Sequence, residues 1–235
     1  MRQPLVLLAF AMLLSACEPP GKPKASDRWQ APAANMDFAS VYAGNCRACH
    51  GDTTGWAASI NLTDPRYALF VDPEALRWVT AGGVDGTTMP GFAISEGGTL
   101  TDDQVILVAD GIIATKGEKV RPPEMPPYAA PLGDPSTGAA VFAAWCVSCH
   151  GDEGKGIAGK SGSIVDGAYL SLVSDQYLRT VTVVGRPELD HPGYDQIVPG
   201  KTMTAQEIAD VVAWLASQRP VVVQSQAPPE NDPVP

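Results

Sequence analysis

Two short stretches of the sequence share one pattern, Cys46-Arg-Ala-Cys-His50 and Cys146-Val-Ser-Cys-His150, and each is followed by Gly-Asp. A Cys-x-x-Cys-His block is the attachment signature of a c-type haem. The spacing suits this chemistry because two thiols can bond to the two vinyl groups of one porphyrin while the adjacent imidazole reaches the iron. A single block would also fit a zinc or redox Cys-x-x-Cys pair followed by a chance histidine. Two copies predict two covalently bound haems c. The predicted attachment residues are Cys46, Cys49, Cys146 and Cys149, and the predicted iron ligands are His50 and His150.

The fifth cysteine, Cys17, follows an apolar run from Leu5 to Leu14 that is too short to span a bilayer. Leu14-Ser-Ala-Cys17 resembles the bacterial lipobox, in which a signal peptidase cuts before the cysteine and the new N-terminus is acylated. The alternatives are an ordinary signal peptide with an incidental cysteine, or an uncleaved anchor. We expect lipidation at Cys17 and an exported protein, lipid-anchored at the periplasmic or outer face of a bacterial membrane.

The charge of the chain is one-sided, with 26 acidic and 16 basic residues and a formal net charge of −10. Nucleic-acid binding depends on Lys and Arg contacts to phosphate, so this composition argues against a nucleic-acid partner. Electrostatic steering would instead favour basic protein partners. The charge would also be explained by solubility alone.

The two motifs lie 100 residues apart, and the similarity between the halves of the chain extends beyond them. Upstream, Phe38–Tyr42 precedes the first motif as Ala139–Phe142 precedes the second, and both segments are typical of a helix. Downstream, Thr101-Asp-Asp-Gln and Thr204-Ala-Gln-Glu both match the capping box, which marks the start of a helix. Apolar helical segments follow both boxes. The chain therefore contains a duplicated unit.

Each unit reads as helix, haem motif, loop, helix, ligand loop and helix, which resembles the class I cytochrome c domain. That family is a small all-α fold wrapped around one haem, and the resemblance covers residues 36–118 and 136–219. It implies an all-α protein with two tandem class I domains joined by a proline-rich linker. The expected order is a lipoprotein signal peptide with lipobox at 1–17, a flexible tether at 18–35, domain one at 36–120, the linker at 121–135, domain two at 136–219 and a disordered tail at 220–235.

The resemblance implies a second axial ligand for the first haem. In class I cytochromes the sixth ligand is a methionine in a loop before the last helix. Thr88-Met-Pro-Gly-Phe92 matches the family's Met-Pro-x-Phe pattern. Met89 is therefore the expected ligand, and the alternative is an ordinary core methionine.

The second unit departs from this pattern. The offset of 102 residues that relates Gly83 to Gly185 carries Met89 onto His191, and Pro-Gly-aromatic follows both residues. His191 is also the only histidine outside the haem motifs. We expect His191 to bind the second iron. The alternatives are Met203, which we assign to packing at the start of the last helix, and a vacant sixth position.

Two further departures concern residues around the haems. The family often has a proline after the haem motif whose carbonyl steadies the proximal histidine, but Ser59–Leu62 and Ser163–Val165 stand there instead. Arg77 and Arg179 either pair with haem propionates or lie on solvated helix faces. Trp214 resembles the aromatic residue that packs the last helix on the first, where it would face Phe142. Its counterpart in the first unit is Gly111, so the contact there must differ.

Six-coordinate haems exchange electrons without binding a substrate, so the resemblance implies an electron carrier or an electron-transfer subunit rather than an enzyme. The expected partners are redox proteins or a membrane respiratory or photosynthetic complex. Methionine ligation raises a haem potential, so electrons should pass from the second haem to the first. The alternatives are a dihaem redox enzyme such as a peroxidase, and a haem-based sensor of small ligands.

Overall fold

The computed structural model describes residues 29–53 and 56–220. Residues 29–35 belong to a separate unit with the short 3-10 helix η2 (Pro32–Ala34), and the rest belong to a second unit that begins at residue 36. The predicted signal peptide with Cys17 lies outside the described residues, as do most of the predicted tether and tail. None of the described helices is long and apolar enough to cross a membrane.

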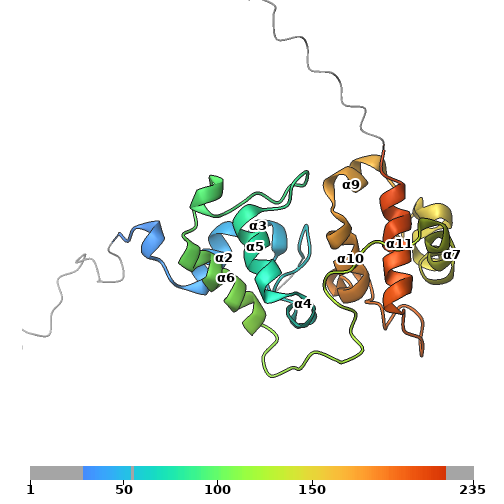
Figure 1. Ribbon diagram of the computed structural model, residues 1–235, viewed down its shortest axis with the longest axis horizontal. Coiled ribbons are helices and arrows are strands. Elements are labelled where there is room, and N and C mark those ends of the chain that lie inside the picture. Colours follow the sequence, from blue (N-terminus) through green and yellow to red (C-terminus); the bar gives the residue numbers. More distant parts are fainter. Residues whose placement is uncertain (1–28, 54–55, 221–235) are drawn as a thin grey trace, which may run out of the picture. The chain divides into compact units, whose positions relative to one another are not determined.

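The described part of the second unit is helical, with β-bridges only as isolated pairs, and the all-α prediction is confirmed. Figure 1 shows the order of the elements along the chain. The first half contains α2 (Phe38–Asn45), α3 (Arg47–His50), α4 (Pro65–Phe70), α5 (Pro73–Gly82), η3 (Ile94–Glu96) and α6 (Asp102–Ala114). The second half contains α7 (Pro135–Trp145), α8 (Val147–His150), η4 (Asp152–Gly154), α9 (Gly167–Leu172), α10 (Asp175–Val184), η5 (Pro187–Leu189) and α11 (Ala205–Ser217).

The last helix of each half begins at the predicted capping box. The side chain of Thr101 accepts a hydrogen bond from the amide of Gln104, and the Gln104 side chain accepts one from the Thr101 amide. Thr204 and Glu207 make the same reciprocal pair at α11. Each pair satisfies two of the amides that a helix start leaves without partners. These two predictions are confirmed.

Each half also contains a short helix that the sequence pattern did not predict. Asp64 caps α4 by accepting from the amide of Arg66, and Asp166 caps α9 by accepting from the amides of Ala168 and Tyr169. The two helices have six residues each. Fewer than two helical turns are too short to display the 3.6-residue periodicity on which sequence prediction depends.

The first and last helices of each half pack against each other, and Figure 1 shows α11 alongside α7. In the second half the rings of Phe142 and Trp214 lie 4.4 Å apart, as predicted. A Cβ atom at Gly138 of α7 would lie 2.7 Å from the Cβ atom of Trp214. In the first half the positions are reversed: a Cβ atom at Gly111 of α6 would lie 2.1 Å from the ring of Phe38 on α2. Each crossing therefore pairs one glycine with one aromatic side chain.

The proline-rich segment after α6, the predicted linker, makes hydrogen bonds with both halves of the chain. Arg121 donates to the carbonyl oxygens of Leu69 and Phe70 at 3.0 and 2.9 Å, and to that of Pro126 at 2.5 Å. Arg179 of α10 donates to the carbonyl oxygen of Pro127 at 2.7 Å. The segment is thus bonded to the first half through its own Arg121 and to the second half through Arg179.

The burial of Arg179 excludes one expectation for this residue. Arg179 is only 3% exposed, so it does not lie on a solvated helix face, and its donors bond to the linker carbonyl oxygens of Pro127 and Tyr128. A buried guanidinium needs such partners because an uncompensated buried charge is costly. Arg77, in contrast, is exposed and pairs with Asp110 at 2.6 Å, which fits its solvated-face alternative.

Candidate functional site

Each haem motif folds as a single helical turn directly after the first helix of its half. Cys46 and Cys146 cap the turns α3 and α8. Gly51 and Gly151 follow the turns with positive φ angles of 64° and 72°. Glycine adopts this backbone conformation without steric cost, which explains why it follows the histidine in both motifs.

The four described cysteines are unpaired, and the first of each motif is the more buried. Burial, with a smaller contribution from the neighbouring cysteine, raises the pKa of Cys46 to about 11 and that of Cys146 to about 12. A redox Cys-x-x-Cys motif depends on a thiolate, whose formation is favoured by a lowered pKa. The raised pKa values of Cys46 and Cys146 therefore argue against a redox role for these thiols.

A main-chain carbonyl accepts a hydrogen bond from His50, the histidine of the first motif, although the residue that supplies this carbonyl is not a proline. The Nδ1 atom of His50 donates to the carbonyl oxygen of Ile60 at 2.8 Å. This bond orients the ring and leaves Nε2 for a metal, the usual arrangement around a ligating imidazole. The buried Nδ1 atom of His150 has no hydrogen-bond partner among the described residues. The Ile60 contact was missed because a carbonyl belongs to every residue and has no sequence signal.

The loops that carry Met89 and His191 have the same backbone arrangement. A Cβ atom at Gly83 would lie 2.6 Å from the carbonyl oxygen of Met89, and one at Gly185 would lie 2.6 Å from that of His191. Both glycines have positive φ angles, 77° and 80°. The offset of 102 residues in the sequence is thus reproduced in space, and Met89 and His191 occupy equivalent positions.

The imidazoles of His150 and His191 lie close together, with ring centroids 5.7 Å apart and ring planes tilted by 49°. Since nitrogen ligands lie about 2 Å from a metal, two imidazoles on opposite sides of one ion have centroids about 6 Å apart. Burial lowers the pKa of both rings, which favours the neutral form that ligates metals. The arrangement therefore fits two axial ligands of one haem iron.

Met203, the competing ligand, is fully buried at the start of α11. Its amide donates to the carbonyl oxygen of Tyr194 at 3.0 Å, just as the amide of Leu100 donates to that of Phe92 at 2.8 Å in the first half. Met203 and Leu100 thus occupy equivalent places. This equivalence supports a packing role for Met203.

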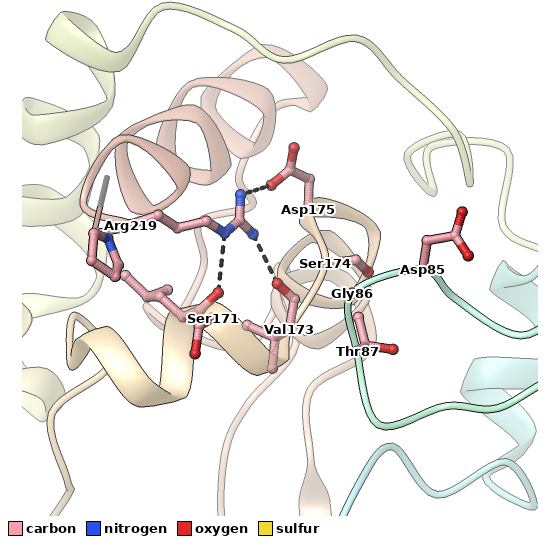
Figure 2. Close-up of a pocket in the computed structure, with 10 residues that line it drawn as sticks. Asp85, Gly86, Thr87, Ser171, Val173, Ser174, Asp175 and Arg219 are labelled. Carbon is pink, nitrogen blue, oxygen red and sulfur yellow. Dashed lines mark hydrogen bonds and ion pairs between the residues drawn. The ribbon is translucent and has the colours of Figure 1, made fainter. Parts of the chain in front are cut away.

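A cavity of about 390 Å³ lies away from the haem motifs, between the turn at 85–87 and residues 170–175 (Figure 2). Figure 2 shows the Arg219 guanidinium bonded within this region. Its donors serve the carbonyl oxygens of Leu170 and Val173, at 3.1 and 2.9 Å, and the Asp175 carboxylate at 2.5 Å. The cavity therefore offers no uncommitted arginine donor to an anionic ligand, and we assign it no role.

Comparison with protein families gives a match for each half. The family model described as cytochrome c matches residues 135–219. The model described as cytochrome c oxidase, cbb3-type, subunit III matches residues 33–110. Each match contains one haem motif and one of the two ligand loops.

Similar curated proteins include two subunits of cbb3-type cytochrome c oxidases. Subunit FixP of Bradyrhizobium sp. (strain ORS 278) is 31% identical over 123 residues, covering 50% of this chain and 39% of FixP. Subunit CcoP of Cereibacter sphaeroides is 29% identical over 129 residues, covering 50% of this chain and 40% of CcoP. The aligned part is thus about two fifths of the length of these relatives.

Among solved structures, a chain of the Kuenenia stuttgartiensis reducing HAO-like protein complex Kustc0457/Kustc0458 is similar at 16% identity and a TM-score of 0.43. The match covers 78% of this chain and 96% of that chain. A similarity this low supports no conclusion about function.

Proposed function

We propose that this protein relays electrons to or from a membrane respiratory complex. The chain is a dihaem class I c-type cytochrome, with two cytochrome c domains in tandem and two covalently bound haems c. Two relatives are named as subunits of cbb3-type oxidases, which supports a complex of this class as partner. The observation that carries the proposal is the pairing of each haem motif with a ligand loop of equivalent geometry, because closed axial positions leave the iron no place for a substrate.

Our proposed ligand set follows the two loops. The haem supplies an iron that accepts and releases one electron, and the side chains of this protein set its potential and keep other ligands away. We assign Cys46 and Cys49 with His50 and Met89 to the first haem, and Cys146 and Cys149 with His150 and His191 to the second. The 5.7 Å separation of the His150 and His191 rings supports the second set.

The difference in ligands predicts a direction of electron flow. Methionine ligation raises a haem potential relative to ligation by two imidazoles. Electrons should therefore enter at the His150 haem and leave from the His50 haem. Lipidation at Cys17 would confine this traffic to a membrane surface, as a tethered shuttle or as a docked subunit.

A redox titration followed by low-temperature EPR tests the proposal on the full chain. We expect two low-spin haems, the upper one with a methionine signature and the lower one with two histidines. A single haem, or a second methionine signature in place of the bis-histidine one, would contradict the ligand set.

Ligand-binding assays separate a relay from an enzyme or a sensor. The reduced wild-type protein should not bind carbon monoxide or turn over peroxide, since both irons are six-coordinate. The variant His191→Ala should bind carbon monoxide at the second haem alone. Carbon monoxide binding by the wild type would favour the sensor, and peroxide turnover would favour the enzyme.

Mass spectrometry of the protein from its native host tests the anchor. We expect two haems and an acylated Cys17, and Cys17→Ser should release a soluble protein that retains both haems. An unmodified Cys17 would remove the basis for membrane tethering and leave the electron-transfer proposal in place.

A further inference from the structure

Arg186 occupies a position beside the predicted ligand of the second haem that is not charged in the first half. It follows Gly185 as Val84 follows Gly83. The amides of both residues donate to the carbonyl of the ligand position: Val84 to Met89 at 3.0 Å and Arg186 to His191 at 2.8 Å. The main chain is therefore shared between the halves, and the charged side chain is new in the second.

The Arg186 guanidinium is buried, with 8% of the residue exposed. Its Nε atom donates to the Glu188 carboxylate at 2.9 Å, and both side chains of this ion pair are close to 10% exposed. Its Nη1 atom lies 3.5 Å from the hydroxyl of Tyr177. Burying charges in this way is costly, and a buried ion pair adds little net stability on average. The pair thus invites a functional explanation.

The remaining donor of Arg186 crosses to the first half of the chain. Its Nη2 atom donates to the carbonyl oxygen of Ala57 at 2.5 Å. Ala57 is 2% exposed and lies against Gly51, where an added Cβ atom would be 2.9 Å from the Ala57 Cβ atom. Gly51 directly follows His50. Arg186 therefore connects the His191 loop with the loop that follows His50.

The charge of Arg186 lies beside both haem sites. Its amide donates to the carbonyl oxygen of His191, and its Nη2 atom donates to that of Ala57, which lies against Gly51 directly after His50. A nearby cation stabilises an added electron, because the interaction of two charges depends only on their separation and the local dielectric. The same charge should thus favour the ferrous state of a haem at either site.

We propose that Arg186 is a positioning residue that couples the two haem sites. It fastens the loop after His50 to the loop that carries His191, and its charge favours the reduced state of both haems. This inference rests on the proposed ligand set, since it requires a haem at each histidine.

A second arginine provides a control for the contact between the halves. Arg66 of α4 pairs with Asp195, donates to the carbonyl oxygen of Val183 at 3.3 Å, and lies over the Tyr194 ring at 5.4 Å from its centroid. Arg66 thus also connects the two halves, through other residues. Its contacts are with Val183, Tyr194 and Asp195, so its removal weakens the attachment of the halves without breaking the bond of Arg186 to Ala57.

The experiment compares the potentials of both haems in the full-length dihaem protein and in Arg186→Gln. We expect the ferrous-to-ferric ratio of each haem, at a fixed applied potential, to fall about tenfold, which is ~59 mV for a one-electron couple. Hydrogen exchange of residues 56–60 should accelerate as the Ala57 contact is lost. Arg186→Lys should restore the potentials and leave the exchange fast, because lysine keeps the charge without the planar fork.

Arg66→Gln and Arg77→Gln are the matched controls and should leave both potentials within about twofold of wild type, expressed as the same ratio. An equal shift in Arg66→Gln would overturn the charge effect, since attachment alone would then explain it. A shift confined to the second haem in Arg186→Gln would overturn the coupling.

If Arg186→Gln loses a haem, a second variant that should shift the haem potential in the opposite direction tests the inference. Glu188→Gln removes the negative partner and should raise the ferrous-to-ferric ratio of the second haem severalfold; an unchanged ratio would overturn the charge effect. The wild-type spectra decide the ligand set before any variant is compared. A wild type with both expected signatures and silent variants would therefore reject only the role of Arg186.

Discussion

The two halves of the molecule build the same helix crossing with the roles of the helices exchanged. In the first half the aromatic Phe38 lies on the first helix and Gly111 on the last. In the second half Gly138 lies on the first helix and Trp214 on the last. Close packing constrains the volume shared by two facing positions rather than the identity of either residue. The pair can therefore be reversed while the crossing is kept.

The two ligand loops share the same backbone arrangement but carry different ligand side chains. Gly83 and Gly185 approach the main chain of Met89 and His191 at the same distance. Methionine and histidine therefore stand at this position in loops of the same backbone arrangement. The comparison predicts that the chemistry of the two sites can be interchanged by single substitutions.

The largest expected effect comes from such an exchange of ligands. His191→Met should raise the potential of the second haem, and Met89→His should lower that of the first, within the ~0.8 V range that axial ligands span. The near-infrared sulfur-to-iron band should appear at the second haem or disappear from the first. Retention of that band in Met89→Ala would show that Met89 is not the ligand.

The next effect concerns the helix crossing. Gly138→Ala would place a Cβ atom 2.0 Å from the carbonyl oxygen of Asp210, whereas Gly111→Ala would meet only the ring of Phe38. A backbone atom yields less than a side chain, so we expect Gly138→Ala to cost about 3 kcal/mol and Gly111→Ala about 1 kcal/mol of unfolding free energy. Chemical denaturation measures both.

Gly44→Ala is the matched control for the crossing, because a Cβ atom there would meet nothing within 4 Å. It lies in α2 and should leave the protein as stable as wild type or slightly more so, since alanine is the better helix former. An equal loss in Gly138→Ala and Gly44→Ala would refute steric crowding at the crossing.

The two capping boxes should respond alike, because their contacts are alike. Thr101→Ala and Thr204→Ala should each cost about 1 kcal/mol of unfolding free energy. Denaturation of each variant measures the loss. Replacement by serine should restore most of it, since the hydroxyl is the acceptor. A loss of unfolding free energy in only one of the two variants would show that only one capping box stabilises the protein.

A substitution of Met203 should have little effect on the second haem. Met203→Leu keeps the volume of a fully buried side chain and reproduces Leu100 of the first half, so we expect a cost below about 1.5 kcal/mol. The spectrum of the second haem should not change. Loss of a methionine band in this variant would instead identify Met203 as the ligand.

Most of the helices could be predicted from the sequence because the two repeats could be compared with each other. The capping boxes were predicted from local pattern, and the contact between Phe142 and Trp214 was predicted from the family resemblance; both are confirmed. The equivalence of Met89 and His191 was predicted from a constant offset, and the loop geometry supports it. Ligation itself stays a prediction, to be decided by the spectra above.

The hydrogen bonds of the buried or partly buried arginines could not be predicted from the sequence. The bonds of Arg179 to the linker carbonyl oxygens were not predicted from the sequence. Arg121 and Arg186 also donate to main-chain carbonyls distant in sequence. An arginine can reach any carbonyl within its length, so its own residue type and spacing do not identify the acceptor.

The sequence by itself determined the two haem motifs, the duplicated unit and the helix starts, because these depend on residues within a few positions of one another. Only the tertiary structure decided that the linker is packed and that Arg186 meets Ala57, 129 residues away. The physical reason is burial: a guanidinium withdrawn from water must find acceptors, and only folding determines which carbonyls lie within its reach.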